Sequence, residues 1–299
     1  MEKNILAVDI GGSKLVVGIV DSCGKVLCSE KYPLPDKYSI EHILDTVFTA
    51  ATDLQSYVPA AVGVTIPGLA DAENGIWEFA PFSGIGNIPI ARLLSERLCL
   101  PVYIENDVNA CAVGEAMYGC CRDEKDFLWI TVSNGIGGAL YLNGKLYTGS
   151  CGNAGEIGHF LVEENTNNRC GCGRVGCLEA MASGRAIAKS FGKEGVTAVD
   201  IAALAREGDP AAMEAFEKAG FYIGKAVASS LNLLNLSKVI IGGGVSLSFD
   251  LLEAPIRRAI AHYVFRQGNP DWQLCQTGLG YHAALIGAAA VAQCKINKE

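Results

Sequence analysis

Short apolar runs separated by glycine-rich turns dominate the first part of the chain. Residues 5–8 and 15–21 form two such runs around a glycine-rich bend, which is the pattern of a β-hairpin. We expect a third strand over 26–34, an amphipathic helix over 39–58 and a buried strand over 61–66. This order of strand, strand, strand, helix and strand predicts an α/β domain.

The segment after residue 66 does not continue this alternation of strands and helices, which returns from residue 90 onward. Residues following 66 form an apolar, loop-like stretch with three aromatic side chains, Trp77, Phe79 and Phe82. We expect a helix over 90–98, a strand over 101–104 and a helix over 108–118. The strand over 101–104 delivers three polar residues, Glu105, Asn106 and Asp107, to its carboxyl end.

The second half opens with a strand and a glycine-rich hairpin of its own. A strand is expected over 126–133, and the hairpin continues over 141–146, where Asn143-Gly144 is a turn signal. Two glycine-rich hairpins, each early in its half, imply duplicated domains facing a common cleft. Further helices are expected over 183–191, 199–206, 211–236, 251–261 and from 283 onward, with a strand over 239–241.

Composition restricts the class of protein. The 299 residues suffice for about two domains, and 50% hydrophobic with 19% charged residues is a globular composition. A formal net charge of −8 argues against a nucleic acid or an anionic membrane as partner. The chain opens without a signal sequence, and its longest uncharged apolar run, 283–292, is too short to span a bilayer. We therefore expect a cytoplasmic protein whose twelve cysteines are reduced thiols plus a metal site.

The densest chemistry lies between residues 149 and 180. One imidazole and three thiols there are the donor set of a closed structural zinc site, namely His159, Cys170, Cys172 and Cys177. Intervening glycines let a short loop bring the sulfurs together. The alternative is a glycine-rich turn with free buried cysteines. Glu156 and Glu179 flank the four donors, so a bound ion would orient a polar pocket that reads hydroxyl groups.

Two glycine-rich turns are candidate anion cradles, because glycine lets backbone N–H groups approach a phosphate closely, and a third glycine-rich turn follows the strand over 239–241. The first follows the strand over 5–8 and comprises Asp9, Gly11, Gly12, Ser13 and Lys14. The second comprises Ser133, Asn134, Gly135, Gly137 and Gly138. The third is Gly242, Gly243 and Gly244. The first lacks Walker A spacing, and the first and the third could also be ordinary turns.

Asp107 stands where a strand gives way to a helix. A carboxylate at such a junction can act as a general base while its element stays rigid. It can equally be a helix N-cap, a position that favours aspartate.

Taken together, these motifs resemble the ROK family of bacterial sugar kinases and regulators. E-x-G-H at 156–159 with C-x-C-G-x2-G-C-x-E at 170–179 looks like the family signature, and E-N-D-x-N-A at 105–110 looks like its catalytic segment. The first glycine turn resembles the first phosphate loop of the actin, hexokinase and Hsp70 superfamily. The resemblance covers the chain from Asp9 to Ala290.

The resemblance implies a fold of two ribonuclease-H-like (actin-like ATPase) α/β domains facing a central cleft. Residues 1–107, completed by the helix at 283–299, would form the small domain, and 108–282 the large domain with the zinc loop. It also implies ATP, Mg²⁺ and a structural Zn²⁺, with phosphate transfer to the 6-hydroxyl of a hexose or hexosamine, foremost glucose. Relatives are commonly homo-oligomers, so a dimer or tetramer is expected.

The resemblance also assigns roles to the residues of this chain that match the family motifs. Asp107 would be the catalytic base, and the three glycine turns would hold the nucleotide. His159 would contact both the zinc and the sugar. The sugar would be bound by Gly68, Gly84, Asn106, Asp107, Glu156, His159 and Glu179.

Three departures and several alternatives accompany this interpretation. Gly84-Ile85 stands where the family has Gly-Trp, and Asn134 and Ala139 replace a threonine and a glycine. N-acetylmannosamine, fructose, allose or a β-glucoside could be the acceptor instead. A sugar-responsive regulator would carry a helix-turn-helix domain ahead of the first loop, yet only eight residues precede Asp9. A metal-binding or chaperone-like ATPase without a sugar conflicts with the flanking carboxylates.

Overall fold

The computed structural model describes residues 3–36, 38–80, 84, 86–193 and 195–297. The chain divides into two compact units. The first comprises Met1–Asp123, Thr148–Asn153 and Gly278–Glu299, and the second comprises Glu124–Tyr147 and Ala154–Thr277. Among the described helices, none combines the length and apolar composition that crossing a membrane requires.

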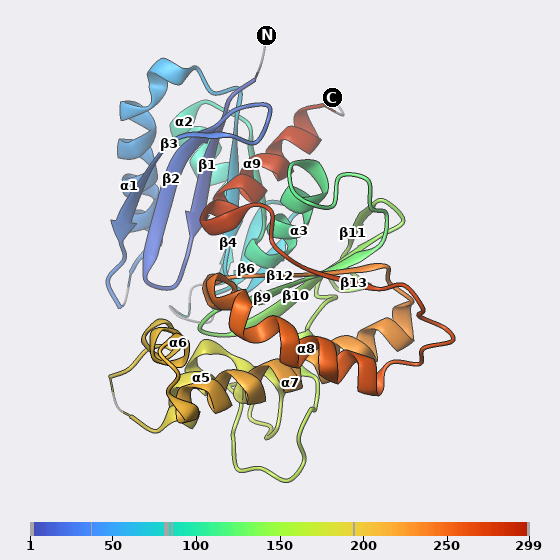
Figure 1. Ribbon diagram of the computed structural model, residues 1–299. Coiled ribbons are helices and arrows are strands. Elements are labelled where there is room, and N and C mark those ends of the chain that lie inside the picture. The colour runs from blue at the N-terminus through green and yellow to red at the C-terminus, as the bar shows by residue number, and fades with distance from the viewer. Residues whose placement is uncertain (1–2, 37, 81–83, 85, 194, 298–299) are drawn as a thin grey trace. The chain divides into compact units, whose positions relative to one another are not determined.

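A mixed five-stranded sheet forms the centre of the first unit, in the order β3-β2-β1-β4-β8 (Figure 1). β2 pairs antiparallel with β1 and β3, whereas β1, β4 and β8 are mutually parallel. The strands are β1 (Ile5–Ile10), β2 (Lys14–Val20), β3 (Val26–Pro33), β4 (Ala61–Ile66) and β8 (Val102–Asn106).

Alternating side chains of this sheet bury both of its faces. Leu6 and Val8 pack in the core that also holds α1 (Ile40–Asp53) and α2 (Ile90–Leu98), and Ile5 packs in the core that holds α9. Two further helices complete the unit, α3 (Asp107–Met117) and α9 (Ala283–Ile296). Glycines let α3 and α9 touch, since a Cβ on Gly287 would lie 2.5 Å from the carbonyl oxygen of Ala110.

The second unit repeats the same topology, with the sheet order β11-β10-β9-β12-β13. β9 pairs antiparallel with β10 and parallel with β12. The strands are β9 (Phe127–Val132), β10 (Ile136–Leu142), β11 (Lys145–Tyr147), β12 (Lys238–Gly242) and β13 (Gln273–Gln276). Two such α/β units with one strand order confirm the predicted fold class, the actin-like ATPase fold.

Helices of the second unit enclose its core. The long helix α7 lies beside α8 in Figure 1, and both contribute to one apolar cluster with β9 and β12. The helices are α4 (Leu178–Ala182), α5 (Gly184–Phe191), α6 (Ala198–Arg206), α7 (Pro210–Leu234) and α8 (Phe249–Tyr263). The described residues also form short 3₁₀ segments, namely η1 (Gln55–Tyr57), η2 (Ile157–His159), η3 (Gly244–Ser248) and η4 (Gly280–His282).

The interpretation of the stretch after residue 66 as a loop was wrong. It contains a three-stranded antiparallel sheet of β5 (Leu69–Asp71), β6 (Ile76–Phe79) and β7 (Gly86–Ile88). Trp77 is fully buried and its Nε1 donates to the carbonyl oxygen of Pro67 at 2.9 Å. Phe82 lies outside the described residues.

One further boundary, that of the first helix, differs from the expectations. The first helix ends at Asp53, with Leu54 as its C-cap, and the left-handed conformation of Val58 (φ 50°) excludes a continuous helix through residue 58. The proposed domain limit after residue 107 stays a prediction, and by its contacts α3 groups with the first unit.

Candidate functional site

Polar side chains gather at the carboxyl ends of three parallel strands in the first unit. The register places Asp9 of β1 opposite Thr65 of β4, and Ile66 opposite Asn106 of β8. Thr65 Oγ1 donates to Asp9 Oδ1 at 2.9 Å, which fixes the carboxylate. The fold therefore brings Asp9 and the segment around Asn106 to one edge of the sheet.

Asn106, and not Asp107, caps helix α3. Its Oδ1 accepts hydrogen bonds from the backbone N–H groups of Val108 at 2.9 Å and Asn109 at 3.1 Å. Its Nδ2 donates to the carbonyl oxygen of Gly68 at 2.9 Å. Asp107 Oδ1 accepts from the adjacent N–H of Val108, at 3.0 Å. Because the cap position is filled, the carboxylate of Asp107 remains available for chemistry.

The Asp107 carboxyl is half-buried and has an unusual acidity. Burial, together with the negative charge of Asp9, raises its pKa from the ordinary 3.8 to about 7, against the opposing hydrogen bond from Val108. Burial also raises the pKa of Asp9, while the bond from Thr65 and the charge of Lys14 lower it. A carboxyl whose pKa is near neutrality is suited to accept a proton from an alcohol.

The first glycine turn closes tightly. Gly11 N donates to the carbonyl oxygen of Lys14 at 2.8 Å, and Ser13 O accepts from Leu34 N at 2.9 Å. Gly12 is part of the same turn. Lys14 Nζ donates to Tyr281 Oη at 3.3 Å. The turn thus places the positive charge of Lys14 beside Asp9. This arrangement suits a phosphate that is bound together with a metal cation.

Glu105 is a buried carboxyl that sequence reasoning left without a role. It accepts from the backbone N–H of Asn106 at 2.9 Å and from Asn109 Nδ2 at 3.1 Å, and burial raises its pKa. It thereby holds the strand end on which Asn106 and Asp107 sit. The one available signal was its place directly before them in the chain.

Two glycines predicted to border the substrate differ in their surroundings. Gly68 has φ 85° and accepts from Asn106, so its left-handed backbone links β4 to α3. Gly84 has φ 70°, and within the described residues no atom lies within 4 Å of its Cβ position. Ile85, the departure from the family pattern, lies outside the described residues.

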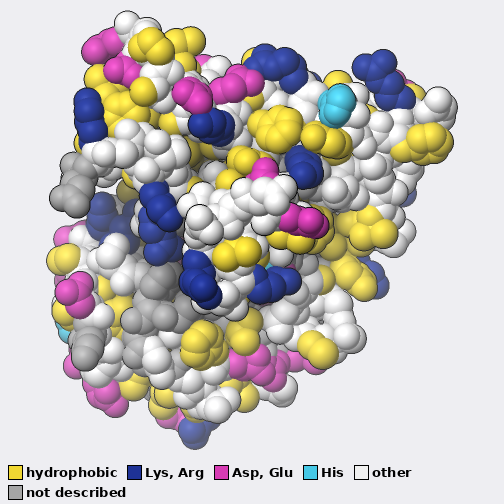
Figure 2. Space-filling model, turned by 90° about the horizontal axis from the view of Figure 1, so that it is seen from below, with side chains coloured by type: hydrophobic (Ala, Val, Ile, Leu, Met, Phe, Trp, Pro, Cys, Tyr) yellow, Lys and Arg dark blue, Asp and Glu magenta, His cyan; other side chains and the backbone are white. Residues whose placement is uncertain are grey.

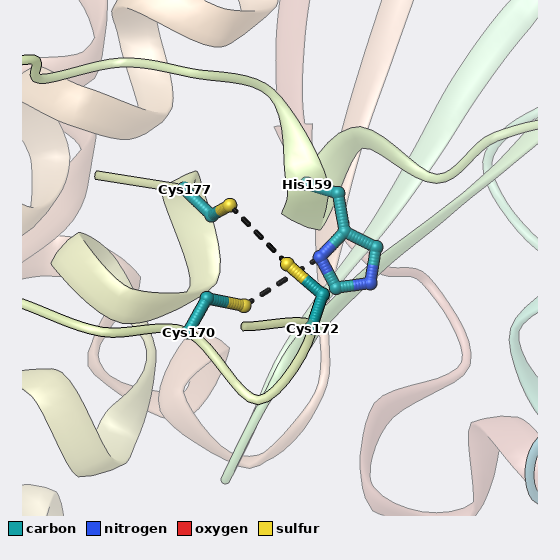
Figure 3. A group of neighbouring side chains, drawn as sticks. All are labelled: His159, Cys170, Cys172 and Cys177. Atoms are coloured by element: carbon teal, nitrogen blue, oxygen red, sulfur yellow. Dashed lines mark hydrogen bonds between the residues drawn. The ribbon is translucent and has the colours of Figure 1, made fainter. Parts of the chain in front are cut away.

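In the second unit, the four predicted donors converge (Figure 3). The donor atoms of His159, Cys170, Cys172 and Cys177, called the metal cluster below, all lie within 4.8 Å of one another. Cys170 Sγ lies 3.6 Å from His159 Nδ1, and Cys172 Sγ lies 3.7 Å from Cys177 Sγ. A tetrahedral zinc with roughly 2.3 Å bonds to sulfur would separate its ligands by about 3.8 Å. The donor set and its spacing therefore fit a zinc ion.

The two flanking glutamates lie against this cluster. Glu156 Oε2 lies 3.7 Å from His159 Nε2, the ring nitrogen that does not face the thiols. Glu179 Oε1 lies 3.8 Å from Cys170 Sγ, and its Oε2 accepts from the backbone N–H of Ile136 at 3.2 Å. A Cβ on Gly135 would meet that same oxygen at 2.5 Å. Glu179 thus joins the metal cluster to the second glycine turn.

The second and third glycine turns are neighbours. Gly243 has φ 83°, and a Cβ there would lie 2.5 Å from the carbonyl oxygen of Val132. Ser133 O accepts from Gly184 N at 2.7 Å. Arg185 was not predicted as part of the site, yet its Nε donates to the carbonyl oxygen of Asn134 at 2.8 Å. The packing of β9 beside β12 brings these turns together, with Gly242 opposite Thr131.

Comparisons with known proteins agree with this chemistry. Residues 5–295 match the ROK family. The chain is 31% identical to the glucokinase of Thermotoga maritima, over 98% of each chain. It superposes with a TM-score of 0.85 on a ROK family glucokinase from Streptomyces griseus solved with glucose and AMPPNP, at 32% identity over 97% of this chain and 98% of that one. A ROK family transcriptional regulator, a homologue of the E. coli MLC protein, gives a TM-score of 0.87 at 28% identity, over 97% of this chain and 78% of that one.

Proposed function

Because this chain belongs to the ROK family and is an ATP-dependent sugar kinase, we propose that it phosphorylates glucose at the 6-hydroxyl. The carboxyl of Asp107, with its pKa raised to about 7 and its helix already capped by Asn106, is the observation that carries the proposal. The near-complete mutual coverage with glucokinases supports glucose as the acceptor.

In this proposal Asp107 is the general base. Its carboxylate takes the proton of the 6-hydroxyl as that oxygen attacks the γ-phosphate of ATP. Asp9, by raising the pKa of Asp107, increases the basicity of that carboxylate. Asn106, held by Gly68 and by the first turn of α3, contacts a sugar hydroxyl.

The remaining sugar contacts come from Gly84 and from the acids around the metal cluster. His159 would contact zinc through Nδ1, which lies beside the thiols, and the sugar through Nε2. Glu156 and Glu179 would accept hydrogen bonds from sugar hydroxyls. Zinc, when bound, would hold these side chains in position, and no step of phosphate transfer passes through it.

The nucleotide would be held by the three glycine turns. Their backbone N–H groups and Lys14 would contact the phosphates, and the turn at Gly242–Gly244 would lie against adenosine. Mg²⁺, when bound with ATP, offsets the charge that develops on the phosphates. We also propose a cytoplasmic homo-oligomer, on the likeness to the family alone.

A sugar-responsive regulator is the alternative, since regulators of the family align with this chain too. The chain spans about three quarters of the length of those regulators. A regulator that transfers no phosphate needs no general base, so the raised pKa of Asp107 favours the kinase.

A coupled assay of ADP release over a panel of sugars tests the proposal. We expect kcat/KM for glucose to exceed the values for N-acetylmannosamine, N-acetylglucosamine, fructose and allose by roughly tenfold or more. A higher value for an N-acylhexosamine would replace glucose as the substrate. ADP release that no sugar stimulates would refute the kinase assignment.

The pH dependence follows from the same carboxyl. A general base acts only when deprotonated, so kcat/KM should fall as the pH drops through about 7, the raised pKa of Asp107. We expect a limiting slope of about one decade per pH unit below that value. Rates measured from pH 5.5 to 8.5 at saturating Mg²⁺ and ATP check this. A flat profile over that range would contradict the role of Asp107.

A further inference from the structure

A small cavity opens beside the start of α5 and borders Cys170 of the metal cluster. Its volume is about 230 Å³. We call it the anion pocket, and its lining includes Arg169, Arg185, Lys189, Glu179 and Ser183. None of these residues except Glu179 has a part in the proposed reaction.

Three of these five side chains are cations, and each donates a hydrogen bond to a neutral oxygen. Arg169 Nη1 donates to the carbonyl oxygen of Gly173 at 3.2 Å, and Lys189 Nζ donates to Asn168 Oδ1 at 3.0 Å. Arg185 Nε donates to the carbonyl oxygen of Asn134. The ion pairs found within the described part of the chain include none of the three.

One carboxylate shares the cavity, and its oxygens are already engaged. Glu179 Oε2 accepts from Ile136 N, and its Oε1 lies nearest to Cys170 Sγ. Ser183 caps α5 by accepting from Ala186 N at 3.2 Å, so the positive end of that helix also borders the cavity. The balance of charge around the cavity is therefore positive.

Figure 2, which views the molecule from below Figure 1, shows Lys and Arg side chains at several places on this face, interspersed with acidic and apolar ones. The chain as a whole has a net charge of −8, whereas three cations and one carboxylate line this cavity, so its local charge is opposite in sign to that of the chain. Arginine and lysine side chains of this kind recognise phosphate, arginine through paired N–H groups and lysine through its charge.

We propose that the anion pocket binds a phosphate-bearing small molecule, separately from the nucleotide. The contacts of Arg185 with Asn134 and of Glu179 with Ile136 connect the pocket to both ends of the second glycine turn. An occupant of the pocket changes these two hydrogen bonds to the turn, and it thereby changes the affinity of the protein for ATP. The occupant is either free phosphate, in mono- or oligomeric form, or a sugar phosphate.

Calorimetric titration of the full chain tests the pocket directly. The protein is titrated in parallel with inorganic phosphate, tripolyphosphate and glucose 6-phosphate, once without nucleotide and once after saturation with AMPPNP and Mg²⁺. We expect binding of at least one probe, weakened by added salt because the contacts are ionic. The probe with the lowest Kd identifies the source of the phosphate group.

The paired substitution Arg169→Ala with Lys189→Ala should weaken that binding by roughly tenfold or more. Lys218→Ala with Arg206→Ala is the matched control, since it removes the same charge from exposed side chains of α7 and α6 in the same unit. Circular dichroism of both variants verifies folding. Equal affinity in the two variants, or no binding of any probe, would overturn the proposal. Loss of probe binding upon AMPPNP saturation would also overturn it, by assigning the cations to the nucleotide site. None of these results depends on whether glucose is the acceptor.

Discussion

Replacing Asp107 with asparagine is expected to lower kcat by roughly 10²–10⁴-fold while leaving the Kd for glucose within a few-fold of the parent value. Asparagine has nearly the same shape but cannot accept the proton of the 6-hydroxyl. Asn106 still caps α3 through Val108 and Asn109, so the helix should form as before. Coupled kinetics and calorimetric titration with glucose measure the two quantities.

The same variant should not be less stable than its parent. Because the folded chain raises the pKa of Asp107 from 3.8 to about 7, the folded state binds a proton more tightly than the unfolded state does. The stability of the parent therefore falls as the pH rises from 3.8 to about 7. Asparagine does not titrate, so the variant does not lose this stability. The free energy of unfolding of the variant, relative to the parent, should increase between pH 5 and pH 8 in urea titrations.

Glu41→Gln supplies the control for both measurements. Glu41 is an exposed acid in the first turn of α1, as Asp107 is in the first turn of α3, so both variants lose one first-turn charge. Its kcat should stay at the parent value. Substantial turnover by Asp107→Asn, or a comparable loss in Glu41→Gln, would remove Asp107 from the role of base.

The second large effect is expected from Cys172→Ser. Serine at this exposed position removes one thiol of the metal cluster without opening a cavity in the core. We expect the zinc content to fall and kcat/KM for glucose to drop by roughly 10–100-fold, mainly through KM, because Glu156 and His159 lose their fixed positions. Atomic absorption and steady-state kinetics check both effects.

Cys151→Ser is the matched substitution, since Cys151 is also an exposed thiol but lies outside the metal cluster. It should retain both zinc and activity. A Cys172→Ser protein that lacks zinc yet binds glucose with the parent KM would show that the metal does not organise the sugar site. Zinc absent from the parent protein itself would make the four residues a cluster of free thiols.

Sequence patterns predicted the elements with a clear run or period of apolar residues. The strand at Ala61–Ile66 and the helix at Ile90–Leu98 were placed at their observed limits, because the strand is apolar except at Thr65 and the helix has a clear 3.6-residue period. β5, β6 and β7 were missed since strands of three or four residues carry too few positions to show an alternation. β13 was missed because it is equally short. In addition, its pairing partner β12 lies 30 or more residues earlier in the chain.

The metal cluster was predictable because its donors lie within nineteen positions of one another in the sequence. Other parts of the site depend on register. The bond from Thr65 to Asp9 joins residues 56 positions apart and follows only from the parallel pairing of β1 with β4. The choice between cap and base at Asp107 likewise needed the observed bonds of Asn106. The raised pKa of Asp107 needed both the burial and the nearby Asp9.

The position of the transferred phosphate tests the central claim most directly. The protein is incubated with ATP, Mg²⁺ and glucose, and the product is identified by two-dimensional ³¹P–¹H NMR. We predict glucose 6-phosphate in an amount equal to the ADP formed, and no sugar phosphate when 6-deoxyglucose replaces glucose. ADP without a sugar phosphate, or a phosphate on any other hydroxyl, would contradict the account.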